Sequence, residues 1–152
     1  MSETNIIIYT DGSARGNPGP GGYGVVMISG QHRKELSQGF KHTTNNRMEL
    51  MSVIVALESI KKHGANVTIY SDSKYVVDSV EKKWVFGWEK KNFAGKKNPD
   101  LWKRFLIVFK KHKIKFVWVK GHADNAENNL CDELAVAAAF GSSLLTDVGY
   151  ES

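Results

Sequence analysis

The chain is poor in cysteine and has no long hydrophobic run, and these two absences limit what it can be. Its single cysteine, Cys131, cannot form a disulfide within the chain, which fits a reducing compartment. No apolar stretch approaches the roughly 20 residues that a membrane-spanning helix needs. Residues 1–5 have no basic region of the kind that opens a secretory signal. We therefore expect a cytoplasmic protein without a membrane segment.

The length of 152 residues predicts one domain, over residues 1–152, large enough to bury a core. The net charge of +5 is not spread evenly along it. Residues 81–104 hold eight cationic side chains against three carboxylates, so the remaining residues sum to zero charge. Concentrated positive charge of this kind predicts a polyanionic partner.

The pattern of apolar residues predicts an α/β fold. Runs rich in β-branched and aromatic residues predict five strands, at residues 5–10, 24–29, 32–42, 67–70 and 114–119. Helical spacing of apolar residues predicts helices at residues 45–62, 73–80, 100–111 and 127–140. Six glycines and two prolines in residues 12–24 predict a connection dense in turns, and we expect a loosely attached tail from about residue 141. This order predicts a mixed sheet with helices on both faces.

Four acidic residues stand where a fold of this kind could bring them together. Asp11 and Asp72 each follow a predicted strand, and open α/β sheets bind ligands beyond the carboxyl ends of their strands. Glu49 and Asp132 lie early in predicted helices. Four convergent carboxylates repel one another unless cations bind, and oxygen ligands select hard ions such as Mg²⁺ or Mn²⁺. A carboxylate site that holds a pair of metal ions is the usual apparatus for phosphodiester chemistry.

Each of these carboxylates taken alone also has an ordinary explanation. Asp72 could cap the next helix, and the Asp-Gly pair at Asp11 is common in turns. Glu133 is an alternative to Asp132, and because adjacent helical residues point about 100° apart, only one of the two should face a site. The prediction of a metal site therefore depends on all four carboxylates together.

Other residues carry weaker signals. His122, which follows the last predicted strand, could exchange protons near neutral pH, or it could be a surface histidine without a role. Asn45 and Asn46 open a predicted helix and could be caps or donors to bases and 2′-hydroxyls. The glycine-rich stretch matches neither the phosphate-loop nor the dinucleotide-binding pattern. Trp102 and Trp118 have apolar neighbours and are expected in the core.

Aromatic residues alternate with lysines in the basic part of the chain, at Trp84, Phe86, Trp88 and Phe93. Such alternation suits contacts with bases or sugars combined with attraction of phosphates. It also suits a segment whose aromatic face packs on the body of the protein. We expect both, with one face buried and the other binding.

Six motifs that occur in order resemble those of bacterial type 1 ribonuclease H. They are Thr-Asp-Gly-Ser at residues 10–13, the glycine-rich stretch at 16–24, Thr-Thr-Asn-Asn-Arg-Met-Glu-Leu at 43–50, Asp-Ser at 72–73, Gly-His-Ala at 121–123 and Cys-Asp-Glu-Leu-Ala at 131–135. The resemblance runs from about residue 5 to residue 150. It implies a five-stranded mixed sheet flanked by helices, three antiparallel strands followed by two parallel additions. It also implies endonucleolytic hydrolysis of the RNA strand of RNA–DNA hybrids by a two-metal-ion mechanism, which leaves 5′-phosphate and 3′-hydroxyl ends.

The same resemblance implies roles for individual residues. Asp11, Glu49, Asp72 and Asp132 match the carboxylates that hold two Mg²⁺ ions, for which Mn²⁺ can substitute, and His122 matches a mobile catalytic histidine. Contacts with the RNA strand are implied for Asn17, Asn45 and Asn46. A pocket for a phosphate of the DNA strand is implied at Thr44 and Asn98. A basic protrusion that binds the DNA strand is implied at about residues 81–99, with Trp84, Lys90, Lys91, Lys96 and Lys97.

Three features depart from the pattern of the family. The basic protrusion is slightly shorter, Ala126 stands where proline is common, and Lys74 stands where many relatives have a neutral residue. Two other functions are compatible with the same fold, namely a catalytically silent hybrid-binding module and a metal-dependent DNA nuclease or strand transferase. A silent module would be expected to have lost a carboxylate, whereas all four are present. We expect a monomer that needs no protein partner.

Overall fold

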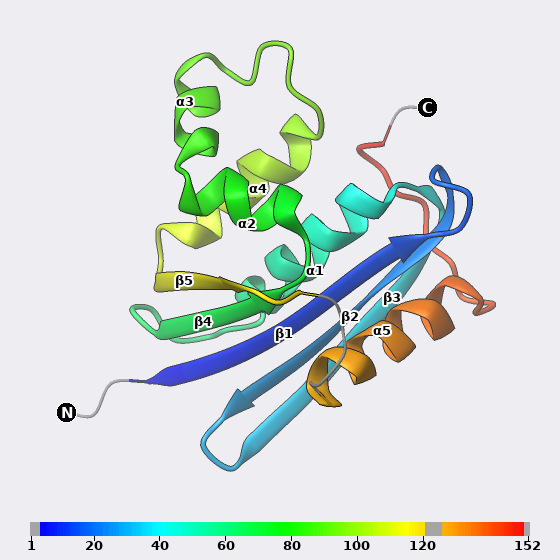
Figure 1. Cartoon of the computed structure of the whole chain (residues 1–152), viewed down its shortest axis with the longest axis horizontal. Coiled ribbons are helices and arrows are strands. Elements are labelled where there is room, and N and C mark those ends of the chain that lie inside the picture. Colours follow the sequence, from blue (N-terminus) through cyan, green and yellow to red (C-terminus); the bar gives the residue numbers. More distant parts are fainter. Residues whose placement is uncertain (1–3, 121–125, 151–152) are drawn as a thin grey trace.

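The computed structural model describes residues 4–120 and 126–150 and shows a five-stranded sheet with helices on both faces (Figure 1). The strands are β1 (Asn5–Ala14), β2 (Gly19–Ser29), β3 (His32–Thr43), β4 (Asn66–Ser71) and β5 (Lys113–Trp118). They lie in the order β3-β2-β1-β4-β5. The first three strands pair antiparallel, whereas β4 pairs parallel with both β1 and β5. The predicted mixed sheet is confirmed.

The helices are α1 (Asn45–Glu58), α2 (Lys74–Glu81), α3 (Trp84–Lys90), α4 (Pro99–Phe109) and α5 (Ala126–Ala139). Thr44 caps α1 by accepting a hydrogen bond from the Arg47 N–H at 3.2 Å. Ser73, rather than Asp72, caps α2 by accepting from the Val76 N–H at 3.2 Å. None of the helices in the described ranges is long and apolar enough to pass through a bilayer.

The two largest helices cover opposite faces of the sheet. Figure 1 shows α5 in front of β2 and β3, and α1 behind β1. The core between α1 and the sheet contains Ile8, Val25 and Ile54, none of which is exposed to solvent. Trp102 of α4 is also fully buried, as the sequence predicts.

Trp118 is different, because 41% of it is exposed and the expectation of a core position is wrong. It is the last residue of β5, and β5 is an edge strand with no further strand to cover it.

The glycine-rich stretch is mostly strand rather than a turn-dense connection. β2 begins at Gly19, so that only residues 15–18 separate it from β1. The physical reason is close helix packing: a Cβ at Gly24 would collide with the Cys131 carbonyl oxygen of α5. Glycines here therefore let α5 lie directly on the sheet, and turn propensity is overridden by tertiary packing.

Two helices differ from the predictions by more than a residue or two. α1 ends at Glu58 instead of residue 62, so the lysines that follow lie outside its last turn. α3 was not predicted at all, because its aromatic and basic residues, with Gly87 among them, show no clear apolar period.

The C-terminal segment, residues 141–150, is held against the body of the protein. Leu145 pairs with β3, where its N–H donates to the Gly39 carbonyl at 3.0 Å and its carbonyl accepts from the Lys41 N–H at 2.9 Å. Asp147 is buried, and its carboxylate accepts from the Thr43 hydroxyl at 2.7 Å. The expectation of a loose tail from residue 141 is therefore wrong for these residues, because a buried carboxylate needs partners that the body supplies.

Candidate active site

Three carboxylates from separate elements meet at one rim of the sheet. Asp11 lies in β1, Glu49 in α1 and Asp72 just after β4, and one oxygen from each lies within 4.8 Å of the other two. The parallel pairing of β1 with β4 runs as far as Tyr9 and Tyr70, so Asp11 and Asp72 each lie two residues beyond the last pair, on the same side of the sheet. Gly12 allows β1 and α1 to lie this close together, because a Cβ at this position would lie only 2.5 Å from the Glu49 backbone nitrogen. We call Asp11, Glu49 and Asp72 the acidic cluster.

The acidic cluster places three carboxyl groups close together around a buried position. Glu49 is only 8% exposed, and burial raises the pKa of its carboxyl group well above the ordinary value, with the negative charges of Asp11 and Asp72 adding to the rise. Its Oε1 atom has no hydrogen-bond partner among the described residues. Such an oxygen, beside two further carboxylates, is a suitable ligand for a divalent cation.

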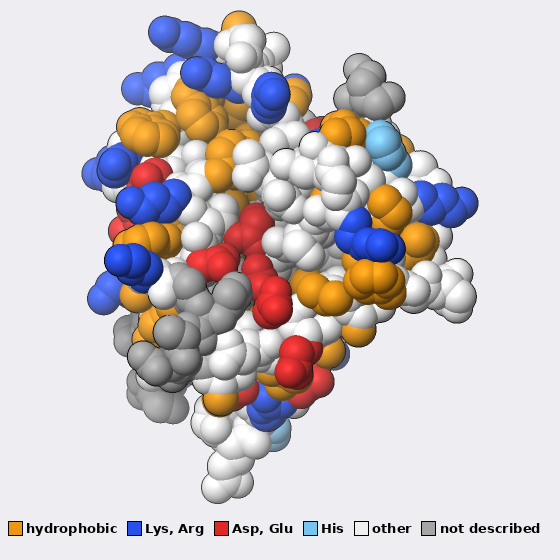
Figure 2. Space-filling view, turned by 45° about the vertical axis from the view of Figure 1, so that its right-hand side comes forward, with side chains coloured by type: hydrophobic (Ala, Val, Ile, Leu, Met, Phe, Trp, Pro, Cys, Tyr) orange, Lys and Arg blue, Asp and Glu red, His pale blue; other side chains and the backbone are white. Residues whose placement is uncertain are grey.

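Asp132 of α5 lines the same cavity as the acidic cluster. The cavity has a volume of about 430 Å³, and Figure 2 shows acidic side chains gathered in the hollow at the centre of that face. Glu133, the alternative considered from the sequence, is exposed and does not line the cavity. The structure thus brings all four sequence-predicted carboxylates to one place, with three of them in mutual contact range.

Two other residues near the sequence motifs have different outcomes. His122 lies outside the described residues. Cys131 is buried, and burial raises the pKa of its thiol to about 12, so the thiol stays protonated at neutral pH. Its S–H group lies 3.2 Å from the Tyr9 carbonyl oxygen, which places Cys131 in the packing of α5 on β1.

The asparagines of the predicted RNA-contact set are held by the backbone. Asn45 Oδ1 accepts from the Ala14 N–H at 2.6 Å, and Asn17 Oδ1 accepts from the Asn45 N–H at 2.9 Å. Because each oxygen is engaged, the NH₂ group of each amide is left as the donor for a ligand. Asn45 and Asn46 line the cavity of the acidic cluster.

A second cavity of about 740 Å³ adjoins the first. Thr44 and Asn98, the predicted phosphate-pocket residues, line it together with Lys97. Asn46 borders both cavities, so a ligand in one can extend into the other.

Arg47 forms the wall of this second cavity and was not singled out from the sequence. It is 1% exposed, and its guanidinium donates to Asp147 at 2.7 Å, to Asp100 at 2.7 Å and to Asn98 Oδ1 at 3.2 Å. Burial alone would lower the pKa of Arg47, but the hydrogen bonds with Asp100 and Asp147 raise it above the ordinary value. Arg47 itself is therefore fully engaged, and its role is to hold the surrounding loops together.

One signal in the sequence could have found this network. A cation in the first turn of a helix opposes the helix dipole, so Arg47 at the start of α1 needs acidic partners from elsewhere in the chain. We call Arg47, Asp100 and Asp147 the arginine network.

The basic protrusion, residues 81–99, contains α3 and stands away from the sheet at the top of Figure 1. Trp84 is 47% exposed, with the Lys82 ammonium 5.3 Å from its ring centroid. Phe93 is buried and Trp88 packs edge-on against Trp102 at 5.9 Å. The expected division into a buried face and an open face is therefore present. The exposed lysines of this segment include Lys90, Lys91, Lys96 and Lys97.

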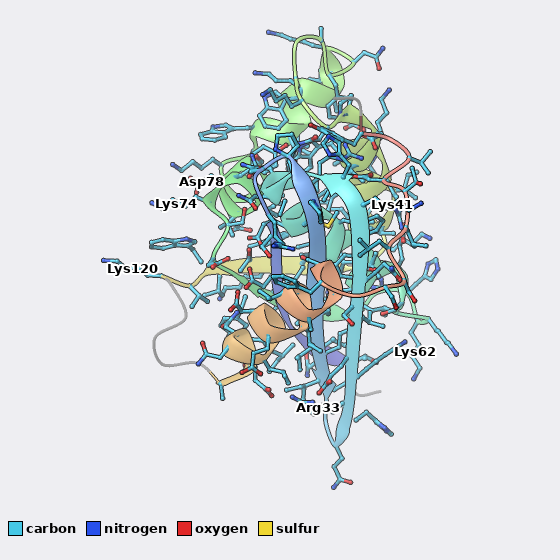
Figure 3. The ribbon with its side chains drawn as sticks, turned by 90° about the vertical axis from the view of Figure 1, so that its right-hand side faces the viewer. Arg33, Lys41, Lys62, Lys74, Asp78 and Lys120 are labelled. Atoms are coloured by element: carbon cyan, nitrogen blue, oxygen red, sulfur yellow. The ribbon has the colours of Figure 1, made fainter. Side chains whose placement is uncertain are left out.

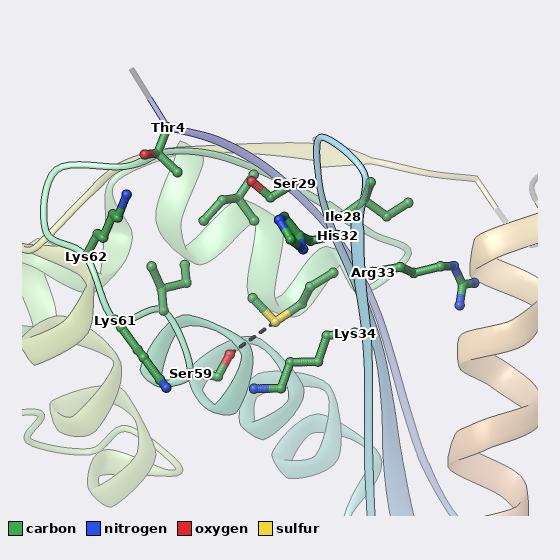
Figure 4. Close-up of a pocket in the computed structure, with 12 residues that line it drawn as sticks. Thr4, Ile28, Ser29, His32, Arg33, Lys34, Ser59, Lys61 and Lys62 are labelled. Carbon is green, nitrogen blue, oxygen red and sulfur yellow. Dashed lines mark hydrogen bonds between the residues drawn. The ribbon is translucent and has the colours of Figure 1, made fainter. Parts of the chain in front are cut away.

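A further hollow, of about 250 Å³, lies at the far end of β1 and β2 (Figure 4). Its walls include Ile6 and Met27, and the Ser59 hydroxyl donates to the Met27 sulfur at 3.1 Å. Lys34, Lys61 and Lys62 stand at its edge, and no carboxylate is among its lining residues. It therefore lacks the carboxylate ligands that gather around Glu49.

Known proteins are similar to this chain over most of its length. The model of the RNase H family matches residues 3–140. A ribonuclease H from Desulforamulus reducens is 54% identical over 148 residues, which cover 94% of this chain and 92% of the relative. A ribonuclease H from Shewanella amazonensis is 54% identical over 157 residues, which cover 99% of each chain.

Solved structures of two RNase H1 proteins have a similar fold. LC9-RNase H1, a type 1 RNase H with the type 2 active-site motif, has a TM-score of 0.82 and 32% identity, and the match covers 91% of this chain and 74% of that one. LC11-RNase H1, solved in complex with an RNA/DNA hybrid, has a TM-score of 0.67 and 30% identity, and the match covers 88% of this chain and 96% of that one.

Proposed function

Because this chain belongs to the ribonuclease H family, we propose that it is an endoribonuclease that hydrolyses the RNA strand of RNA–DNA hybrids by a two-metal-ion mechanism. The observation that carries this proposal is the acidic cluster, three carboxylates within 4.8 Å of one another at the rim of the sheet. Asp132 in the same cavity supplies the fourth carboxylate.

The four carboxylates are the residues that would hold Mg²⁺, with Mn²⁺ as a substitute. The buried Glu49 Oε1 atom without a hydrogen-bond partner among the described residues supports this fit. Two such ions supply the electrostatic stabilisation and the activated water that phosphodiester hydrolysis requires. Asp11 and Glu49, which are nearly inaccessible to solvent, keep their oxygens in place before a ligand arrives.

The products are proposed to be a 5′-phosphate and a 3′-hydroxyl end, because water attacks phosphorus and the bond to the 3′ oxygen breaks. No side chain needs to act as a nucleophile in this scheme. The Cys131 thiol is unsuitable for that role, since it is buried and its pKa is raised to about 12. His122 is proposed, from its place in the sequence, to exchange a proton near the cavity.

Recognition of the RNA strand is proposed to depend on amide donors beside the carboxylates. Asn45 and Asn17 have their oxygens engaged by the backbone, so their NH₂ groups are oriented as donors. Asn46, which borders both cavities, is proposed to join them. The 2′-hydroxyl can accept such hydrogen bonds, and only RNA presents it.

The DNA strand is proposed to lie across the second cavity and the basic protrusion. Thr44 and Asn98 would bind one of its phosphates, because they line the second cavity close to Lys97. Trp84 offers an exposed ring to the sugar-phosphate chain. Lys90, Lys91, Lys96 and Lys97 would add affinity that depends on salt and not on base sequence.

The first test is Mg²⁺-dependent cleavage of a hybrid labelled on its RNA strand, beside matched all-RNA and all-DNA duplexes. We expect cleavage of the hybrid RNA alone, loss of cleavage with EDTA, and 5′-phosphate ends on the products. Binding of the hybrid without cleavage in both Mg²⁺ and Mn²⁺ would show a silent binding module instead. Cleavage of the DNA duplex would show a nuclease of the same fold with another substrate.

We propose that the chain acts as a monomer without an obligatory protein partner. All four carboxylates of the described cavity come from one chain, which supports this proposal. A cytoplasmic location is proposed from the sequence alone.

A further inference from the structure

A single lysine stands at the rim of the cavity that holds the acidic cluster. Lys74 is exposed, lines that cavity and opens α2 two residues after Asp72. A cation in the first turn of a helix is unfavourable for the helix itself, because the helix dipole is positive there. The stability of α2 therefore does not explain a lysine at this position.

Trp118 supports the Lys74 side chain. The Lys74 ammonium lies 4.5 Å from the centroid of the Trp118 ring, within the range of a cation–π contact. The Trp118 indole N–H points to the Asp72 carbonyl oxygen at 3.3 Å. One indole thus contacts both the lysine and the backbone of a residue in the acidic cluster. This arrangement also accounts for the exposure of Trp118, which has one face available to a side chain outside the core.

The Lys74 charge has no acidic partner among the described residues. By contrast, Lys82, which directly follows the same helix, pairs with Asp78 at 3.7 Å. In Figure 3 both Lys74 and Lys120 project toward the same side of the molecule, away from the sheet. A solvated cation beside a cavity that attracts metal ions is suited to a phosphate carried by the same substrate.

We propose that Lys74, held on the Trp118 ring, binds the RNA-strand phosphate adjacent to the one that is cleaved. The proposal rests on the proposed function, because it takes the strand in the acidic cavity to be RNA. Lys74 is then a positioning residue, and its binding energy places the scissile phosphate over the carboxylates. The ring of Trp118 restricts the lysine, so that less freedom is lost when the phosphate binds.

The test compares Lys74→Gln, Lys74→Arg, Trp118→Leu and Trp118→Phe across a series of KCl concentrations. For Lys74→Gln we expect KM to rise about two- to fivefold, the range for one solvated ion pair, with a larger effect on KM than on kcat. The slope of log(kcat/KM) against log[KCl] should become shallower by about 0.7–0.9. Lys74→Arg should restore both values. Lys62→Gln, which removes the same charge at the far hollow of Figure 4, should change neither.

Variants of Trp118 test whether its indole ring supports the Lys74 side chain. Trp118→Leu should raise KM in the same direction as Lys74→Gln, and the double variant should be no worse than Lys74→Gln alone. Trp118→Phe keeps a ring face but loses the N–H group, so it should retain most of the salt slope. Additive effects in the double variant would overturn the role of Trp118 as a support.

Equilibrium binding separates this inference from the proposed function. Hybrid binding by Asp11→Asn, with and without Lys74→Gln, gives the salt slope of the dissociation constant without any cleavage. A slope unchanged by Lys74→Gln would overturn the phosphate contact, even if the protein cleaves hybrids. A shallower slope supports the contact, even if wild-type cleavage is absent. If Lys74→Gln changed only the Mg²⁺ concentration needed for activity, the phosphate contact would also be overturned, because Lys74 would then affect metal binding alone.

Discussion

Arg47 and Glu49 lie two residues apart on α1, and both are nearly inaccessible to solvent, yet their surroundings are opposite. Around Arg47, two carboxylates and an amide oxygen satisfy the guanidinium. Around Glu49, the neighbours are two further carboxylates, and one of its oxygens has no hydrogen-bond partner among the described residues. One buried charge is balanced by the fold, and the other is not.

The difference shows how the protein divides its buried charges between two tasks. The arginine network joins α1, the start of α4 and the C-terminal segment, so its balanced charges are structural. The acidic cluster reduces the stability of the metal-free protein, because repulsion and burial disfavour its ionised form. Protonation of Glu49 or a bound cation relieves that strain, and a cluster of this kind is a candidate functional site. The predictions below test this division, starting with the largest expected effect.

Removing one carboxylate of the acidic cluster should abolish cleavage without unfolding the protein. For Asp11→Asn or Asp72→Asn we expect a loss of more than about 10³-fold in kcat, as for other essential catalytic groups. The melting temperature should not fall, because a repulsive charge has been removed. Cleavage of labelled hybrid and thermal melts measure the two quantities. Glu133→Gln, an exposed neighbour of Asp132, is the matched control and should be near wild type. Near-normal turnover of either cluster variant would contradict the metal site.

Removing one carboxylate of the arginine network should have the reverse outcome. Asp147→Asn leaves a buried guanidinium short of a partner, and we expect a loss of about 3–5 kcal/mol in the free energy of unfolding. Urea denaturation measures this loss directly. Asp100→Asn should cost less, because its side chain is 39% exposed and solvent replaces part of the interaction. Equal losses for the two variants would mean that burial does not set the strength of this network.

Charges that are exposed rather than buried should affect binding more than stability or turnover. Replacing Lys90, Lys91, Lys96 and Lys97 with glutamine should raise KM. The slope of log KM against log[KCl] should decrease by up to about 3. Steady-state kinetics across KCl concentrations provide the measurement. An unchanged slope would show that the basic protrusion does not contact phosphates. The control variant replaces four exposed lysines elsewhere, namely Lys34, Lys61, Lys62 and Lys111.

The smallest effect is expected from the strain at Glu49. Its folded-state pKa is raised, so the folded protein loses stability as pH rises from the ordinary glutamate value near 4.3 toward the folded value. In EDTA at neutral pH, Glu49→Gln should therefore melt at a higher temperature than wild type, by roughly 2–4 °C for each kcal/mol relieved. The difference should disappear below about pH 4, where the wild-type carboxyl is protonated in both states. A variant that is less stable at neutral pH would contradict the account of strain.

Local patterns were enough to predict most of the fold. β-branched runs predicted the strands, and alternating or helical spacing separated them from the helices. The expected position of Asp11 and Asp72 after two strands, together with two helical carboxylates, predicted where a site would form, although β1 in fact continues past Asp11 to Ala14. These features depend on neighbouring residues, so they can be recognised before the chain is folded.

The misassigned features depend on contacts between distant residues. β2 begins at Gly19 because it pairs with Thr43 of β3 there, and α5 packs on its glycines further along. The C-terminal segment is held because Asp147 contacts Arg47, 100 residues away. Trp118 is exposed because β5 is an edge strand. None of these facts can be read from local propensity.

The sequence by itself determined the order of the five strands and of every helix except α3, the choice of the four carboxylates and the concentration of positive charge in one segment. Only the tertiary structure decided that Arg47 would meet carboxylates of opposite charge, whereas Glu49, two positions later, would meet carboxylates of the same charge. The physical reason is that the ionisation of a buried group depends on desolvation and on charges within a few ångströms. Those neighbours come from β1, the end of β4, the start of α4 and the C-terminal segment, which meet only when the sheet and helices have assembled.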